Sequence, residues 1–209
     1  STRKESSAAS DVYKRQEMPL FALSRRSGDV ITPLRTLATV VAGAGLLTLA
    51  AKVQLPFWPV PMTLHTLAVM ALALGLPPRH AVAAFRAYLA AGACGLPVFS
   101  GSPERGIGWV YLMGPTGGYL LGYLVASGLV GRLAASDSNG IRRLLAMLAG
   151  LLPVYVLGAA WLVRFVPVDQ VLALGVTPFL LGDLAKVLVL AAGWPVLSRG
   201  ADWFRSLRS

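Results

Sequence analysis

The chain has 209 residues, of which 56% are hydrophobic and 13% are charged, and its mean hydropathy is +0.65. A water-soluble domain has about a quarter of its residues charged, so this composition argues against one. The apolar content also excludes disorder over most of the chain. One cysteine, Cys94, cannot form an internal disulfide. The composition therefore indicates an integral membrane protein.

The net charge is +10 and the sequence pI is about 10.5, values that often accompany nucleic-acid binding. Here the basic residues lie at the ends of apolar segments, which is the distribution that sets membrane orientation. We therefore expect a membrane lipid environment and no nucleic-acid partner.

The first 16 residues are polar and non-periodic, and residues 11–16 (DVYKRQ) resemble a translated sequencing adapter. We interpret 1–16 as such a remnant; the alternative is a natural cytoplasmic tail. The expected organisation is a disordered N-terminal tail over 1–29, a membrane domain over 30–198 and a basic cytoplasmic tail over 199–209.

Six apolar segments follow one another, separated by Gly- and Pro-containing stretches. They cover approximately 33–53, 63–76, 80–96, 117–133, 144–166 and 178–197. Lipid cannot hydrogen-bond to exposed backbone groups, and the segments do not alternate as barrel strands do. The sequence therefore predicts an all-α integral membrane protein with six transmembrane helices.

Lys and Arg residues are distributed unequally between the two sides of such a bundle. With a cytoplasmic N-terminus, the inner side receives Arg25, Arg26, Arg35, Arg79, Arg132, Arg142, Arg143, Arg199, Arg205 and Arg208. The outer side receives Lys52, Arg105 and Arg164. Because the cytoplasmic side carries the excess of positive charge, both termini are expected in the cytoplasm.

Asp183 and Lys186 lie three residues apart inside the last apolar segment, which places them on one helix face with Cβ atoms about 5–6 Å apart. One charge at the bilayer centre costs at least about 2.5–3.5 kcal/mol. One explanation is a self-neutralising pair that extends toward the interface. The other is a polar site open to the outside, in which carboxylate and ammonium hold an amide-like or urea-like group inside an apolar pocket.

Other candidate functional residues are few. Arg86 lies within the third segment, and either an extended side chain reaching the interface or a ligand or helix contact explains it. His65, at the start of the second helix, is expected to make a structural hydrogen bond. No phosphate-binding loop is present, the two histidines lie far apart in sequence, and no histidine follows Ser127 to activate it. The sequence favours binding over catalysis.

Four sequence blocks, in order, are PVPMTLHTLAV (59–69), GLPVFSG (95–101), GPTGGYLLG (114–122) and PFLLGDLAK (178–186). Together they resemble BioY, the biotin-specific S-component, or substrate-binding membrane subunit, of energy-coupling-factor (ECF) transporters. The resemblance extends over about 33–198. It implies the six-helix S-component fold and capture of biotin, as the transported ligand, near the outer face.

The resemblance also implies specific ligand contacts. In the family the Asp and Lys of the fourth block contact biotin, which corresponds to Asp183 and Lys186. Weaker correspondences, in the loop after the second block and in the third block, are Gly101, Ser102, Thr116 and Tyr119. The segments 54–62 and 97–113 are expected to act as lids. The sequence departs from the family at His65, where Gln is more frequent, and at Arg86.

The family resemblance further implies partners that supply energy: a membrane coupling subunit and two cytoplasmic ATPase subunits. Ala38 and Ala42 form an Ala-x-x-x-Ala face on the first helix, which suits either close docking to that subunit or packing within the chain. We expect no enzyme activity, no cofactor and no metal, and a location in a prokaryotic plasma membrane. Two alternatives stay open: an S-component for thiamine or riboflavin, and a membrane hydrolase using Asp183.

Overall fold

The computed structural model of the chain describes residues 20–55, 62–134 and 139–206, with side chains described for 33–54, 62–134 and 139–198. Contacts divide the chain into two units, Ser1–Thr39 and Val40–Ser209, and the division falls within helix α2 (Leu20–Lys52). The described residues of the first unit are helical. The second unit contains the remaining elements.

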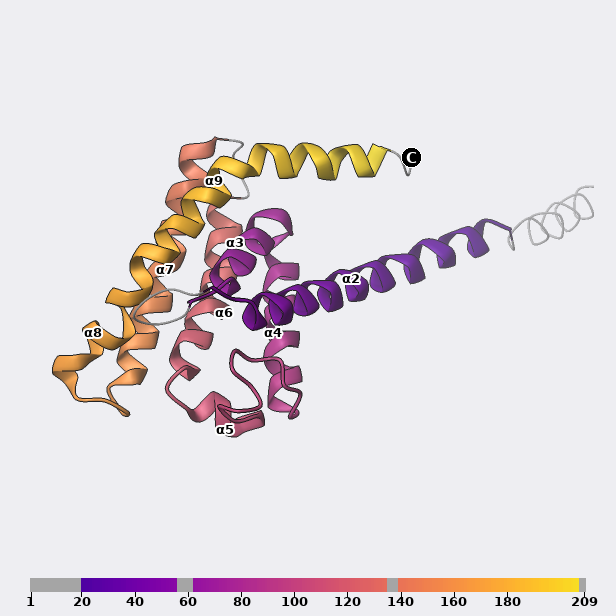
Figure 1. Ribbon diagram of the computed structural model, residues 1–209. Helices are drawn as coiled ribbons and strands as arrows, with labels where there is room; N and C mark the ends of the chain where they lie inside the picture. The colour runs from indigo at the N-terminus through magenta and orange to yellow at the C-terminus, as the bar shows by residue number, and fades with distance from the viewer. Residues whose placement is uncertain (1–19, 56–61, 135–138, 207–209) are drawn as a thin grey trace, which may run out of the picture. The chain divides into compact units, whose positions relative to one another are not determined.

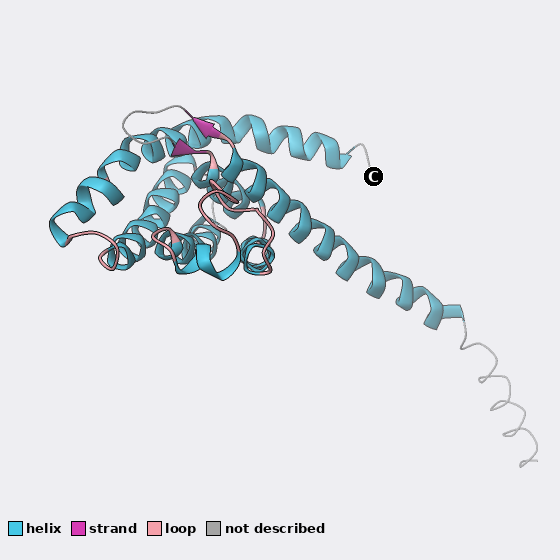
Figure 2. Cartoon of the chain, turned by 60° about the horizontal axis from the view of Figure 1, so that its bottom comes forward, coloured by secondary structure: helices cyan, strands magenta, loops and turns pink. Residues whose placement is uncertain are grey.

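The described residues are mostly helical (Figure 1). The longer helices after α2 are α3 (His65–Gly75), α4 (Pro78–Ala93), α6 (Gly117–Ala134), α7 (Gly140–Leu162) and α9 (Thr177–Ser206). The shorter helices are α5 (Gly108–Met113), η1 (Val168–Gln170) and α8 (Val171–Gly175). Strands β1 (Gln54–Leu55) and β2 (Met62–Thr63) form a small antiparallel pair (Figure 2). All six apolar segments expected from the sequence coincide with helices.

Helix length separates these segments into two groups. Among the described residues, three helical stretches are long and apolar enough to span a membrane: Pro33–Lys52, Gly140–Leu162 and Val168–Ser198. Helix α3 has 11 residues, and at 1.5 Å per residue it is shorter than the hydrocarbon core of about 30 Å. The all-helical class is confirmed, and the number of six crossings stays a prediction.

Helices α2 and α9 extend into the segments that the sequence predicted to be tails. Helix α2 begins at Leu20, inside the tail predicted over 1–29, and α9 continues to Ser206, inside the tail predicted over 199–209. Polar residues near a helix end do not stop a helix whose backbone hydrogen bonds continue. Residues 1–16 lie outside the described residues.

Large apolar side chains cover the outer surface of the second unit. On α7, Leu145, Leu152 and Val156 are each more than half exposed, and on α9 Leu181 and Val189 are equally exposed. Soluble monomers rarely display contiguous apolar surface on this scale. The buried charged residues among those described, Asp183 and Lys186, lie inside instead. Apolar outside and charged inside is the arrangement of a transmembrane protein.

Glycines allow α6 and α7 to approach closely. A Cβ on Gly122 would lie 2.5 Å from Cα of Val154, and a Cβ on Gly118 would lie 2.5 Å from the carbonyl oxygen of Leu157. Small residues permit this contact between backbones, which replaces the hydrophobic driving force that lipid removes. The third sequence block thus fixes α6 against α7, and Figure 1 shows α9 beside α7. All three helices contribute residues to the wall of one cavity.

Candidate functional site

A cavity of about 190 Å³ lies within the second unit. Its wall is formed by residues of α2, α3, α4, α5, α6, α7 and α9, together with residues of β2, of the loop after α4 and of the turn between α5 and α6. The residues that carry polar or aromatic groups into this wall are Thr63, His65, Thr66, Tyr88, Ser100, Arg105, Tyr111, Thr116, Tyr119, Tyr123, Tyr155, Phe179, Asp183 and Lys186. Such a wall suits a ligand with both an apolar body and polar groups.

Asp183 and Lys186 form an ion pair within the wall. The Lys186 ammonium donates to Oδ1 of Asp183 at 2.9 Å, and the two residues are 4% and 9% exposed. Asp183 lies six residues after the first residue of α9, between one and two turns into the helix. The three-residue spacing brings the two groups together as expected. The structure therefore shows a mutual ion pair that is also part of the cavity wall.

Tyr155 on α7 completes the polar surroundings of the carboxylate. Its hydroxyl donates to Oδ2 of Asp183 at 2.9 Å. Each carboxylate oxygen thus has a partner and keeps further acceptor capacity. Among the described residues, the Lys186 ammonium donates to no other acceptor, so two of its three N–H groups are available to a ligand in the cavity.

A second polar pair lies on α3 and α6. The hydroxyls of Thr66 and Tyr123 lie 2.6 Å apart, and either can be the donor. His65 lies beside this pair, with its ring centroid 5.0 Å from that of Tyr123 and 5.2 Å from that of Tyr88. These groups add hydroxyl and imidazole chemistry to the cavity wall.

His65 was expected to make a structural hydrogen bond at the start of α3. The ring is buried, and among the described residues neither Nδ1 nor Nε2 has a hydrogen-bond partner. The backbone carbonyl of Leu47 lies near the ring, outside hydrogen-bonding geometry. At the helix start only the backbone N–H of His65 donates, to Oγ1 of Thr63 at 3.4 Å. A buried imidazole without partners in a cavity wall is a group that a ligand can satisfy.

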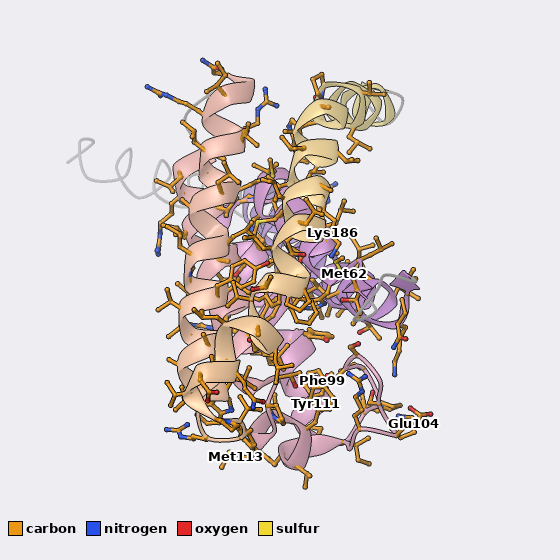
Figure 3. All side chains as sticks on the ribbon, turned by 60° about the vertical axis from the view of Figure 1, so that its left-hand side comes forward. Met62, Phe99, Glu104, Tyr111, Met113 and Lys186 are labelled. Atoms are coloured by element: carbon orange, nitrogen blue, oxygen red, sulfur yellow. The ribbon has the colours of Figure 1, made fainter. Side chains whose placement is uncertain are left out.

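The loop after α4 is fixed by aromatic contacts. Phe99 stacks on Tyr111 of α5 with ring centroids 4.6 Å apart, and meets Tyr88 of α4 edge-on at 5.4 Å. The Tyr111 hydroxyl donates to the carbonyl of Ser100 at 2.8 Å. Figure 3 shows Phe99 and Tyr111 together on the loop side of the cavity, away from Lys186 and Met62. These contacts hold Ser100 and Tyr111 in the wall.

The structure brings together four of the six ligand contacts implied by the resemblance. Asp183, Lys186, Thr116 and Tyr119 all line the cavity. Gly101 and Ser102 do not belong to its wall, although their neighbours Ser100 and Arg105 do.

Gly101 and Ser102 instead shape the loop. Gly101 has a φ of +68°, a conformation that favours glycine, and a Cβ there would lie 2.7 Å from Cδ of Arg105. Ser102 is buried and accepts hydrogen bonds from the Lys52 ammonium, at its carbonyl (2.5 Å) and at its hydroxyl (2.9 Å). Their role is therefore to position the loop rather than to line the cavity directly.

The structure also adds residues that sequence reasoning missed. Arg105 is exposed, as a loop residue should be, but it also lines the cavity. Tyr88, Tyr123 and Tyr155 were missed altogether. A concentration of tyrosines on facing helices is a usable signal, because a buried hydroxyl needs a polar partner. The proline-rich lid expected over 54–62 lies mostly outside the described residues.

The chemistry of the site is that of a binding pocket. Among the described residues, no group of three or more His, Cys, Asp or Glu side chains could hold a metal ion. The wall offers a carboxylate acceptor, ammonium donors and an imidazole within an aromatic surface. This set suits a small ligand with N–H donors and carbonyl or carboxylate acceptors.

The two alanines expected to dock a partner both lie on α2. Neither lines the cavity, and the side chains of Ala38 and Ala42 are exposed. This exposure leaves the docking prediction open.

Known proteins match the chain over most of its length. The model of the BioY family matches residues 19–202. The chain is 35% identical over 162 residues to "Biotin transporter BioY2" of Lactococcus lactis, covering 76% of this chain and 87% of that protein. It is 33% identical over 152 residues to "Probable biotin transporter BioY" of Pyrococcus horikoshii, covering 73% and 89%.

One solved structure is similar in fold: a crystal structure of the S-component for biotin from an ECF-type ABC transporter. It superposes with a TM-score of 0.68 over 80% of this chain and 93% of that chain, at 24% sequence identity. That likeness shows the S-component fold. With the family model covering most of its length, the chain belongs to the BioY family.

Proposed function

We propose that this chain is the biotin-binding membrane subunit of an ECF-type vitamin uptake transporter, capturing biotin at the outer face and releasing it toward the cytoplasm. The observation that carries the proposal is the buried Asp183–Lys186 pair in the cavity wall of a chain that belongs to the BioY family. Relatives from Lactococcus lactis and Thermotoga maritima are named biotin transporters.

The chemistry of biotin suits this cavity. Its ureido ring has two N–H donors and one carbonyl, its thioether ring is apolar, and its acyl chain ends in a carboxylate. Asp183 can accept a ureido N–H, and Lys186 can donate to the ureido carbonyl or to the terminal carboxylate. His65 and the tyrosines supply the remaining polar contacts and an aromatic surface for the rings. The complete set of binding residues is part of this proposal.

The proposed topology has six crossings with both termini in the cytoplasm of a prokaryotic cell. It is supported by the excess of Arg on one side of the helices and by six helices that coincide with the apolar segments. In this orientation the start of α9, near Asp183, faces outward. The cavity then lies nearer the side from which a vitamin is taken up.

The proposed partners are a membrane coupling subunit and two cytoplasmic ATPases. The sequence has no phosphate-binding loop with which to hydrolyse ATP itself. Exposed Ala38 and Ala42 support a close helix contact with the coupling subunit. In this account the chain is a binding subunit and not an enzyme.

The docking face can be tested by substitution and co-purification. Ala38→Trp is expected to keep biotin binding and to abolish co-purification with a coexpressed coupling subunit. Leu37→Trp, also exposed on α2 but turned about 100° around the helix, is the matched control and should keep co-purification. Co-purification of both variants would remove the docking proposal and leave biotin binding untouched.

Titration calorimetry of the purified protein in detergent tests the function. Biotin should bind at a stoichiometry of one, whereas thiamine and riboflavin should neither bind nor compete. The bound molecule, extracted and examined by mass spectrometry, should be unchanged biotin. Binding of thiamine or riboflavin instead would assign another vitamin, and a chemically altered product would support the hydrolase alternative.

A further inference from the structure

Three arginines line a surface groove that the biotin proposal does not use. Arg79 and Arg86 of α4 and Arg132 of α6 surround a space of about 630 Å³, and Val82, Ala83 and Gly128 contribute apolar or small surface to it. The groove lies along the N-terminal half of α4, whereas the ligand cavity meets α4 through Tyr88, nearer its C-terminus.

Helix geometry explains how arginines so far apart in sequence reach one groove. Arg79 and Arg86 are seven residues apart, about two turns or 10 Å along α4. A helical side chain leans toward the N-terminus of its helix, so the long Arg86 side chain extends toward Arg79. Gly128 of α6 lies against Val82, where an added Cβ would be 3.2 Å from Cγ2 of that valine, which brings Arg132 to the same end.

Among the residues that the structure describes, no acidic side chain balances the charge in this groove. None of the residues lining it is acidic. Among the described residues, neither a hydrogen bond nor an ion pair involves the guanidinium groups of Arg79, Arg86 and Arg132. Three like charges around one space repel each other, and Arg86 lies inside an apolar helix where an uncompensated charge is costly. An anion that enters the groove removes both penalties.

We propose that the groove binds the phosphate of an anionic phospholipid headgroup. Guanidinium groups bind phosphate oxygens through paired, charge-assisted hydrogen bonds, and basic pockets between transmembrane helices are typical headgroup sites. Val82 and Ala83 give the groove an apolar side along which an acyl chain can lie. A free phosphate ion would use the arginines but not this apolar surface, which favours the lipid.

Native mass spectrometry of the whole, delipidated protein tests this proposal, with dioleoyl phosphatidylglycerol, dioleoyl phosphatidylcholine and inorganic phosphate as separate probes. The wild-type protein should retain phosphatidylglycerol preferentially.

Arg86→Gln and Arg132→Gln should each weaken that binding by about fivefold. Arg35→Gln, which removes an exposed arginine of α2 outside the groove, should leave it unchanged. An unchanged thermal unfolding midpoint in detergent verifies that each variant is folded. Arg132 is exposed near a helix end, so its replacement provides a second variant should Arg86→Gln not fold.

Several results would overturn the proposal. Equal retention of phosphatidylcholine and phosphatidylglycerol, or equal losses in the groove and control variants, would mean that no headgroup site exists there. Inorganic phosphate bound as well as the lipid would make the groove a simple anion site. Unchanged lipid binding with loss of coupling-subunit co-purification would assign the groove to a protein partner. None of these results depends on whether biotin is the transported ligand.

Discussion

The hydroxyl of Tyr155 on α7 donates a 2.9 Å hydrogen bond to Oδ2 of Asp183 on α9, while Lys186 occupies the other carboxylate oxygen. Residues of two helices, α7 and α9, therefore hydrogen-bond to the buried carboxylate of Asp183. A buried ion pair without further hydrogen bonds seldom repays its desolvation, and Tyr155 supplies such a bond. The same contact turns the carboxylate toward the cavity that both residues line.

Asp183→Asn is expected to weaken biotin binding by at least about tenfold, because the amide keeps the shape of the carboxylate and loses its charge. The change also leaves the Lys186 ammonium buried without an anionic partner, which is strongly unfavourable. Calorimetric titration with biotin measures the effect. Asp169→Asn, at an exposed aspartate of η1, is the matched control; equal affinities for the two variants would exclude Asp183 from the site.

Tyr155→Phe removes one charge-assisted hydrogen bond and preserves the aromatic surface. A hydrogen bond to a charged group contributes about 1.5–3 kcal/mol, so biotin affinity should fall by about tenfold or more. Tyr119→Phe is the comparison variant: it removes another hydroxyl of the cavity wall, which donates to the backbone carbonyl of Gly175 at 2.9 Å and is not bonded to the ion pair. A larger loss for Tyr119→Phe would show that the orientation of Asp183 does not govern binding.

Lys52 is expected to hold the loop after α4 in place over the cavity. Its ammonium donates to both the carbonyl and the hydroxyl of Ser102. Lys52→Met removes both bonds to Lys52, whereas Ser102→Ala keeps the one to the carbonyl and removes the one to the hydroxyl, together with the 2.7 Å bond that this hydroxyl donates to the carbonyl of Phe99. Hydrogen exchange of residues 100–106 and the rate of biotin dissociation should rise in the order wild type, Ser102→Ala, Lys52→Met. Identical exchange in all three proteins would show that this contact does not stabilise the loop.

Gly122→Ala is expected to destabilise the bundle. The added methyl group would lie 2.5 Å from Cα of Val154 and 2.7 Å from the carbonyl oxygen of Pro153, both backbone atoms, so α6 and α7 must separate. Overpacking of this kind costs about 1–3 kcal/mol. Thermal unfolding in detergent should show a lower midpoint for Gly122→Ala. Gly45→Ala is the control, because no atom lies within 4 Å of its new methyl group. It should leave the unfolding midpoint unchanged or raise it slightly, since alanine favours the helix. A lower midpoint for Gly45→Ala than for Gly122→Ala would contradict the packing described for α6 and α7.

The sequence predicted the helical class, the positions of six helices and the Asp183–Lys186 pair correctly. Those features depend on local signals: apolar runs, Gly and Pro between them, and the cost of a charge in lipid. Helices α2 and α9 continue past the apolar segments that predicted them. Local composition does not report where backbone hydrogen bonding stops.

Other parts of the site could not be predicted because they depend on distant contacts. Tyr155 meets Asp183 across 28 residues, and Thr66 meets Tyr123 across 57. No pattern within one helix indicates which tyrosines of another helix face the same space. Ser102 was expected in the ligand site from the resemblance, yet its partner is Lys52, which belongs to a helix 50 residues earlier.

A structure of the protein with biotin bound tests the central claim most directly. Biotin is expected in the cavity between α3, α6, α7 and α9, with a ureido N–H within hydrogen-bond distance of Asp183 and with Lys186 donating to a biotin oxygen. Biotin bound elsewhere, with the Asp183–Lys186 pair contacting only itself and Tyr155, would contradict it.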